Sequence, residues 1–286
     1  MSFTLLLNSS NVVGPNNSTF QYKFTNGNFT IPDGSEMAIS QCTIPYSWYN
    51  ITAVNQNTTF NIQWVNTGAT VQSFTIPNGF YDIDSLNAYI QSICIQNGWF
   101  LIDSNGNYVY YIVLSTNSNL YKIQLLLINV PISLPSGWSA PSVASGYPAN
   151  WPGYPASTTT PIFSLNSSGS VGSIIGFAGG GSWGGGSSSV SVVSTSTPNI
   201  TPVNSLTMRC NIINNPITVP TDILDAIPIN STFGSNINYA PNYEKWVRIS
   251  SGRYNSITLT LNDQNLNPLY ALDPNVSITL LIKTPK

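Results

Sequence analysis

Residues 256–263 read Ser-Ile-Thr-Leu-Thr-Leu-Asn-Asp, in which Ile257, Leu259 and Leu261 alternate with polar side chains. Successive side chains of a β-strand point to opposite faces, so this stretch predicts a strand with one buried and one polar face. Such strands are typical of antiparallel β-sandwiches. The same two-residue period recurs in six further sets of residues: Phe20, Tyr22 and Phe24; Phe60, Ile62 and Trp64; Tyr108, Tyr110, Ile112 and Leu114; Tyr121, Ile123, Leu125 and Leu127; Leu206, Met208, Cys210 and Ile212; Val276, Ile278, Leu280 and Ile282.

Turn-forming residues separate these alternating runs. Asp103-Ser104-Asn105-Gly106 carries the Asn-Gly signal of a tight hairpin. Pro32-Asp33-Gly34 and Pro77-Asn78-Gly79 end strands in the same manner. Alternating runs joined by such turns predict an all-β fold.

One segment, residues 82–97, has a helical period instead. Asp82 or Asp84 can cap its start, and Asn97-Gly98 supplies a left-handed stop. We therefore expect one short amphipathic helix over residues 83–97, lying across a sheet edge or a barrel end. Its apolar face consists of Ile83, Leu86, Ile90, Ile93 and Cys94.

Residues 131–203 are rich in proline, glycine and serine, and residues 179–189 read GGGSWGGGSSS. Such a composition cannot form continuous sheet or helix. Two apolar runs inside it, at 163–165 and 174–177, indicate that the segment is docked on the fold. We therefore expect a jelly-roll β-sandwich in three parts: residues 1–130 with helix 83–97, a long Gly/Ser/Pro-rich insertion at 131–203, and the closing strands at 204–286.

Few side chains are available for chemistry. The 286 residues include eight Lys and Arg, ten Asp and Glu and no histidine, for a net charge of −2. A Ser-His-Asp triad is therefore impossible, and a cysteine nucleophile would lack its usual histidine base. We expect a protein that is not an enzyme and that has no catalytic, cofactor or metal site. A pair of carboxylates for glycoside hydrolysis stays open as the enzymatic alternative.

The charge pattern also limits the partners. The basic residues are scattered without a stripe, so we expect no specific nucleic acid partner. No run of 18 apolar residues exists, so we expect no membrane span. A nearly uncharged surface gives little repulsion between copies and suits self-assembly. An AT-rich genome, which produces chains rich in Asn and Ile, is the alternative explanation of this composition.

The three cysteines are predicted to be structural. Cys42, Cys94 and Cys210 lie far apart, each in an apolar stretch and without Cys-x-x-Cys spacing. We expect buried free thiols in a reducing compartment.

Two groups of charged residues have two interpretations each. Asp82, Asp84 and Asp103 could bind calcium, but their spacing does not match a calcium loop, and caps and a hairpin explain them. Charges flanking Trp246 could link neighbouring subunits, whereas a solvated strand face is the simpler interpretation. These charges belong to Glu244, Lys245 and Arg248.

Aromatic residues of the insertion form a third candidate group. Exposed rings in a loop could stack on a glycan or contact a receptor, whereas aromatics of all-β chains usually lie in the core. The candidates are Tyr147, Trp151, Tyr154 and Trp183.

Four stretches, in this order, resemble motifs of one known family. They are residues 74–90 (FTIPNGFYDIDSLNAYI), residues 173–177 (SIIGF), residues 204–215 (NSLTMRCNIINN), and the C-terminal strings at 257–263, 267–269 and 276–283. Their order and spacing resemble the penton, or minor capsid, proteins of virophages and Polinton-like viruses. Apart from Ile-Gly-Phe at 175–177, the insertion 131–203 does not match the family's pattern.

The resemblance implies a single jelly roll and a structural role in the virion. Five copies would form a homopentamer at each icosahedral vertex and fill the hole between double-jelly-roll major capsid proteins. Assembly in the host cytoplasm would proceed through a cyclic, heterologous interface. The insertion would be placed to meet a host receptor or glycan. A carbohydrate- or receptor-binding jelly roll, such as a fibre head, is the alternative function.

Overall fold

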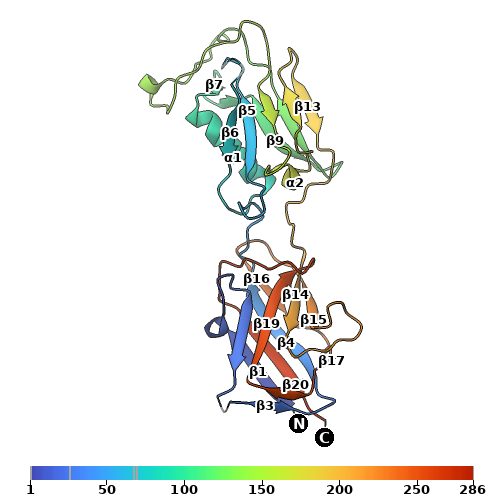
Figure 1. Ribbon diagram of the computed structural model, residues 1–286. Coiled ribbons are helices and arrows are strands. Elements are labelled where there is room, and N and C mark those ends of the chain that lie inside the picture. The colour runs from blue at the N-terminus through green and yellow to red at the C-terminus, as the bar shows by residue number, and fades with distance from the viewer. Residues whose placement is uncertain (1, 26, 67, 69, 286) are drawn as a thin grey trace. The chain divides into compact units, whose positions relative to one another are not determined.

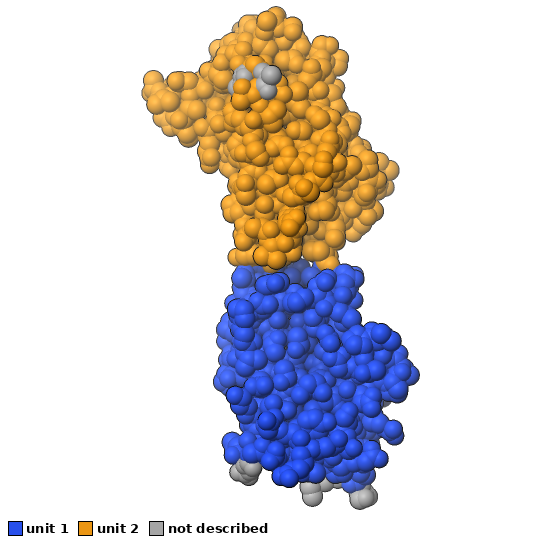
Figure 2. Space-filling view, viewed as in Figure 1, with its two compact units in different colours: residues 1–48, 203–286 blue, residues 49–202 orange. Residues whose placement is uncertain are grey.

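The computed structural model describes residues 2–25, 27–66, 68 and 70–285. The chain forms two compact units, coloured separately in Figure 2: unit 1 comprises residues 1–48 and 203–286, and unit 2 comprises residues 49–202. Every pairing between the named strands in the described part of the chain is antiparallel, so the predicted all-β class is confirmed.

The described residues of unit 1 form an eight-stranded jelly roll with three short additional strands (Figure 1). Its elements are β1 (Ser2–Asn8), η1 (Ser9–Asn11), β2 (Thr19–Lys23), β3 (Phe29–Ile31), β4 (Glu36–Pro45), β14 (Ser205–Cys210), β15 (Ile223–Pro228), β16 (Asn236–Tyr239), β17 (Val247–Arg248), β18 (Gly252–Tyr254), β19 (Ser256–Asp263) and β20 (Ser277–Lys283). One sheet has the order β1-β20-β4-β16, with β17 also paired to β4, and the other has the order β15-β14-β19-β2.

The strand pairs of unit 1 are nested. β1 pairs with β20, β2 with β19, β4 with β16, and β14 with β15. Successive pairs belong to alternate sheets, which is the arrangement of a jelly roll built from two Greek keys. The predicted jelly roll is therefore confirmed, and unit 2 is inserted between β4 and β14.

The two-residue period explains which face of each strand is buried. Ile257, Leu259 and Leu261 of β19 are buried, and the intervening threonines are half-buried. On β20, Ile278, Leu280 and Ile282 are buried in the same way. Each sheet of unit 1 therefore turns one apolar face toward the interior, as the alternation predicts.

Unit 2 is a second β-rich body with one long helix. Its elements are β5 (Thr59–Gln63), β6 (Gln72–Thr75), α1 (Ile83–Gln96), β7 (Phe100–Ile102), β8 (Tyr108–Tyr110), β9 (Ile112–Asn117), β10 (Lys122–Leu127), η2 (Val143–Ser145), β11 (Ile162–Ser164), α2 (Gly172–Ile175), β12 (Ser182–Gly184) and β13 (Val190–Val193). The sheets have the orders β12-β11-β5-β6, β13-β10-β9 and β7-β8.

Helix α1 forms where the helical period predicts it. The Asp82 carboxylate accepts hydrogen bonds from the Ser85 backbone N–H at 2.7 Å and from its hydroxyl at 2.6 Å, so Asp82 is the N-cap. The helix ends before Gly98, whose φ of +69° is left-handed and whose Cα lies against the Asn150 backbone. At Gly98 a side chain would be strained and would clash, so this position requires glycine.

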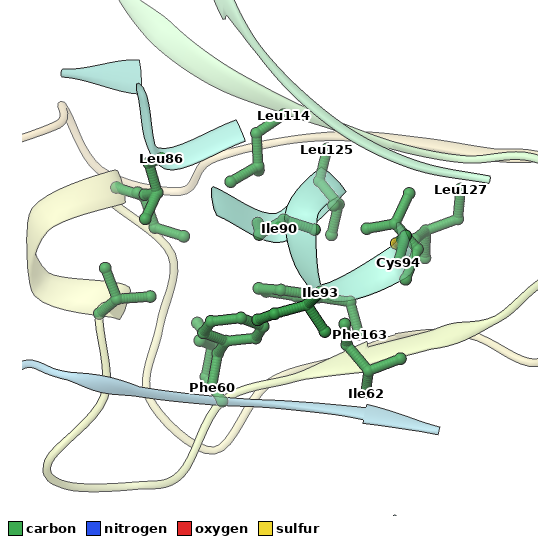
Figure 3. Packing of buried hydrophobic residues seen from close by; sticks show 14 of the residues in the cluster. Phe60, Ile62, Leu86, Ile90, Ile93, Cys94, Leu114, Leu125, Leu127 and Phe163 are labelled. Atoms are coloured by element: carbon green, nitrogen blue, oxygen red, sulfur yellow. The ribbon is translucent and has the colours of Figure 1, made fainter. Parts of the chain in front are cut away.

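The core of unit 2 lies on both sides of α1. Figure 3 shows Ile90 and Cys94 of α1 between Phe60 of β5 and Leu114 and Leu125 of β9 and β10. The Asn87 side chain also accepts a hydrogen bond from the Leu114 backbone N–H at 2.9 Å. Helix α1 thus covers the free edge of β9, in agreement with the predicted position across a sheet edge.

The boundaries between the parts of the chain differ from the predicted ones. Residues 49–130 do not belong to the jelly roll, because β5 pairs with β11 and β10 pairs with β13. The segment 131–203 therefore supplies strands that complete the sheets begun by residues 49–130. The two apolar runs inside it are packed as expected: Phe163, Leu165, Ile174, Ile175 and Phe177 are buried. Alternation predicts a strand but not its partner, which is why the boundaries were wrong.

The single strand expected over Tyr108–Leu114 is also wrong. The chain bends at Tyr111 and divides the run into β8, which pairs with β7, and β9, which pairs with β10. Tyr111 is only 2% exposed, whereas Tyr108 is 42% exposed. The bend turns Tyr111 into the core of unit 2, where it contacts Trp64.

None of the helices within the described residues is long and apolar enough to span a membrane.

The two ends of unit 2 meet at a buried asparagine, and this contact generates a prediction. The Asn50 side chain donates hydrogen bonds to the carbonyls of Tyr81 and Ile200, each at 2.8 Å, and accepts one from the Tyr81 N–H at 2.9 Å. Residues 49–202 should therefore fold as a separate chain. Asn50→Ala should lower its free energy of unfolding by about 1–3 kcal/mol, because buried groups lose their partners.

Urea unfolding of residues 49–202, with the native Asn50 and with Asn50→Ala, measures this difference in the free energy of unfolding. Asn55→Ala, at an exposed position, is the control and should change the free energy by less than about 0.5 kcal/mol. Equal losses in the two variants would contradict the role given to Asn50.

Candidate assembly surfaces

The carboxylates considered as calcium ligands are engaged in local backbone structure. Asp82 caps α1, as described above. Asp103 accepts hydrogen bonds from the backbone N–H and the side chain of Asn107 at 2.8 and 3.1 Å and from the backbone N–H of Asn105 at 2.9 Å. These bonds, those from Asn107 above all, lower the pKa of its carboxyl group. Asp84 lies in the first turn of α1. The capping and hairpin interpretations therefore account for these residues.

No metal-binding cluster is formed by the residues that the structure describes. Among them, no three Cys, Asp or Glu side chains gather in a way that could hold a metal ion.

The three cysteines are buried free thiols, as predicted. Burial is the main cause that raises the pKa of Cys42 and Cys94 to about 12 and that of Cys210 to about 11. A thiolate is the reactive form of cysteine. These side chains therefore act as small apolar core residues.

The aromatic residues of the insertion pack against other rings of unit 2. Tyr147 contacts Phe100 and Tyr108, with ring centroids 5.5 and 6.1 Å apart. Trp183 contacts Phe177 at 4.9 Å.

Trp151 and Tyr154 belong to a second aromatic group in unit 2. Their ring centroids lie 5.4 Å apart, and Trp151 also contacts Trp64 at 5.8 Å. Trp64 in turn stacks on Trp99 at 5.3 Å with an angle of 4° between the planes. The four rings are half-buried, so each packs against neighbouring rings of unit 2 and keeps part of its surface in solvent.

One open side of the jelly roll, between β15 and β16, is closed by a polar network. The Asp225 carboxylate accepts a hydrogen bond from the Tyr239 hydroxyl at 2.7 Å and from the Lys245 ammonium at 3.0 Å. The Asp225 side chain is only 10% exposed. We call this surface the polar flank, defined by Asp225, Tyr239 and Lys245.

The polar flank accounts for part of the charged group around Trp246. Lys245 pairs with Asp225 of the same chain, but its side chain is 59% exposed, so its charge is solvated as well as paired. The ammonium of Lys283 lies over the Trp246 ring, 5.1 Å from its centroid, and 3.1 Å from the Glu36 carboxylate. Glu244 and Arg248 are exposed. No pattern in the sequence indicates Asp225 and Tyr239, because these residues meet Lys245 only after the sheets pack.

The opposite open side, between β1 and β2, is closed by aromatic rings. Phe3 of β1 contacts Phe29 of β3 with centroids 5.5 Å apart, and Phe29 stacks on Phe24 at 5.1 Å. Phe24 contacts Tyr22 of β2 at 5.3 Å. We call this surface the aromatic flank, defined by Phe3, Tyr22, Phe24 and Phe29.

Two of the edge strands, β1 and β15, differ in their protection against pairing with another chain. β1 presents seven residues without a charge or a proline along an edge that β20 does not cover. β15, on the polar flank, contains Asp225 and ends at Pro228. Charges and prolines protect sheet edges against pairing with another chain. The edge of β1 is therefore less protected than that of β15, whereas β2 ends in Lys23 and β16 contains neither a charge nor a proline.

Comparison with known proteins gives structural likeness alone. No protein-family model matches the chain, and no curated protein sequence matches it. Similar solved structures include the penton protein of mavirus, with a TM-score of 0.45 and 12% identity over 100% of this chain and 99% of that one. A chain in the cryo-EM structure of the Sputnik virophage is similar with a TM-score of 0.41 and 11% identity, over 99% of this chain and 96% of that one.

The buried thiols predict low reactivity. In the native protein, Cys42, Cys94 and Cys210 should not react with a thiol reagent such as DTNB in the time that fully labels an introduced Val54→Cys, because Val54 is 69% exposed. All three should react after unfolding in guanidinium. Rapid labelling of a native cysteine would contradict the burial of that side chain.

The polar flank predicts a dependence of stability on alkaline pH. The hydrogen bond to Asp225 is the main cause that raises the pKa of Lys245 above 10.5, and burial is the main cause that raises the pKa of Tyr239 above 10.0. Both groups hold their protons more tightly in the folded chain. The stability they confer is therefore complete below these unfolded values and is lost as the pH rises through the folded ones.

Asp225→Asn tests this dependence. The thermal midpoint of the variant should be lower than that of the wild type at neutral pH, and the difference should shrink above about pH 10. An NMR titration of Lys245 should show its pKa falling toward the ordinary lysine value in the variant. Asp33→Asn, in an exposed turn, is the control. A difference that stays constant up to about pH 11 would contradict the assignment.

Proposed function

We propose that this chain is a structural capsid protein that forms the fivefold vertex, or penton, of an icosahedral virus particle. The observation that carries the proposal is a jelly roll whose two open flanks differ, together with four motifs that resemble those of virophage and Polinton-like penton proteins. A jelly roll is used by viral capsid proteins, lectins and cupins, so the fold alone does not select among these functions.

The family motifs coincide with defined elements of both units. Residues 74–90 run from the end of β6 into α1, and residues 173–177 cover α2 and the turn after it. Residues 204–215 contain β14, and the C-terminal strings contain β19 and β20. The resemblance therefore spans unit 2 as well as the jelly roll, which supports a relation over the whole chain.

The low charge of the chain suits side-by-side packing. A group that loses water at an interface costs free energy, and this cost is large for charges. Only 18 of the 286 residues are Lys, Arg, Asp or Glu. The three ion pairs found among the described residues lie within unit 1 and engage six of these side chains. Since four of the 18 charged residues belong to unit 2 and 14 belong to unit 1, these pairs neutralise six of the 14 within the chain and so lower the loss of charge hydration at a contact between copies.

The proposal also covers how copies of the chain assemble and what lies next to them. Five copies form a closed homopentamer by a cyclic, heterologous contact, which needs two different surfaces on each copy. The ring lies in the virion beside double-jelly-roll major capsid proteins, and assembly takes place in the host cytoplasm. No enzymatic step is part of this function. The candidate aromatics of residues 131–203 are half-buried against other rings of unit 2, and we do not propose that they bind a receptor or a glycan.

The proposal predicts a fivefold assembly. Light scattering of the purified protein should give a mass five times the 30.9 kDa of the chain, or particles that contain the chain should show it as a feature with fivefold symmetry. Unit 2 expressed alone as residues 49–202 is the control and should remain a monomer, because the two flanks to which the proposal assigns the contact belong to unit 1. A chain that is monomeric in solution and absent from particles would reject the proposal.

A further inference from the structure

The most exposed large apolar side chains of the described residues lie in one loop of unit 1. Ile217 is 90% exposed and Val219 is 94% exposed. Both belong to the loop 211–222, which connects β14 to β15. Figure 1 shows this loop projecting from the side of unit 1 that carries β15. Apolar side chains that are this exposed to water favour binding to a partner that buries them.

The loop is held in one shape by its own hydrogen bonds. The Asn215 backbone N–H donates to the Thr221 carbonyl at 2.7 Å, and the Asn215 side chain accepts from the Ile217 N–H at 3.3 Å. The Thr218 hydroxyl lies 2.9 Å from the Pro220 carbonyl.

An ion pair connects the two ends of the loop. Arg209 of β14 binds the Asp222 carboxylate through two nitrogens, at 3.0 Å for Nε and 2.7 Å for Nη2. This bidentate geometry is the stronger form of the Arg–carboxylate pair. Ile217 and Val219 are therefore presented on a preorganised loop, which lowers the entropy lost on binding.

The aromatic flank contains a cavity that matches these side chains. Its volume is about 170 Å³, and its lining includes Phe3, Thr4, Tyr22, Phe24 and Phe29. A cavity of about 150 Å³ lined by apolar residues is large enough to hold a benzene molecule. An isoleucine or valine side chain is of comparable size. None of the described residues that line the cavity is charged.

The loop and the cavity lie on opposite sides of the jelly roll at a similar level along its strands. The loop connects to the edge strand β15, and the cavity lies beside β2, the other edge of the same four-stranded sheet. Three strand spacings separate these edges, or roughly 14 Å. At the base of the loop, the Asn211 backbone N–H donates to the carbonyl of Thr258, next to Ile257 in the cavity lining.

We propose that the loop 214–221 of one copy packs Ile217 and Val219 against the aromatic flank of the next copy and inserts one of these two side chains into its cavity. The inference rests on the proposed function, since it names the contact that would close the ring. A projection on one side and a complementary cavity on the other make a head-to-tail contact, which forms a ring when the rotation between copies closes. Because both lie at a similar level, all copies would stand side by side in one orientation.

Two single cysteine variants test the contact directly. The native cysteines are buried, so Thr4→Cys at the cavity and Val219→Cys in the loop each introduce an exposed thiol. On mild oxidation, the mixture of the two variants should give a disulfide-linked dimer that neither variant gives alone. A chain that carries both substitutions should give a ladder of linked species that stops at five chains. A dimer formed by Val219→Cys alone would mean that the loop meets itself, which overturns the inference.

A double substitution tests the energetics of the contact. Ile217→Asn with Val219→Asn should weaken association about 100-fold, since burial of one such side chain contributes roughly a tenfold factor or more. Val54→Asn with Val71→Asn, at two exposed positions of unit 2, is the matched control and should leave association unchanged. Unchanged thermal unfolding would show that the substituted loop leaves the fold intact, as its exposure leads us to expect.

The outcomes separate this inference from the proposed function. A fivefold mass without a Thr4→Cys/Val219→Cys product would overturn the inference and leave the penton proposal standing. The absence of that product at the highest concentration reached would likewise overturn the inference, whatever the mass of the native protein. A native chain that is monomeric in solution and absent from particles would overturn the penton proposal itself.

Discussion

The pairing of the first strand with the last is the contact on which unit 1 depends. β1 and β20 pair over their full lengths, from Ser2 with Lys283 to Asn8 with Ser277, and bury Leu5 and Leu7. The other strand pairs are nested inside this one, so the whole of unit 2 can be inserted between β4 and β14 without interrupting a sheet. A long insertion is tolerated because its two ends meet, and the entropy of closing a loop grows only slowly with its length.

The nesting also leaves the jelly roll with two unlike sides. One side ends in β1 and β2 and is closed by aromatic rings around a cavity. The other ends in β15 and β16 and is closed by the carboxylate of Asp225 with its two partners. A cyclic assembly of one chain needs two different, complementary surfaces on each copy. A fold without internal symmetry provides them directly, and a chain with few charges allows them to come together at little cost in hydration.

Much of the local structure could be predicted from residue patterns. The period of two identified the buried faces of β5, β14, β19 and β20, and the helical period with Asp82 and Gly98 identified α1 to within a residue. The cysteines were correctly expected to be buried thiols. The run from Tyr108 to Leu114 failed as a single strand because a bend at Tyr111 leaves the alternation of apolar residues almost unchanged.

Whether a segment forms a strand or a helix, and which of its faces is buried, could be predicted from the local order of residues. The reason is that the direction of a side chain follows from its position in the repeat. Pairing between distant segments is a different matter. Nothing in the alternation of β5 or β10 says that β11 and β13 complete their sheets, or that unit 2 begins at residue 49. The flanks are likewise products of packing. Phe3 meets Phe29, and Asp225 meets Lys245, only when strands remote in sequence are brought together by burial of their apolar faces, a force that has no preferred partner.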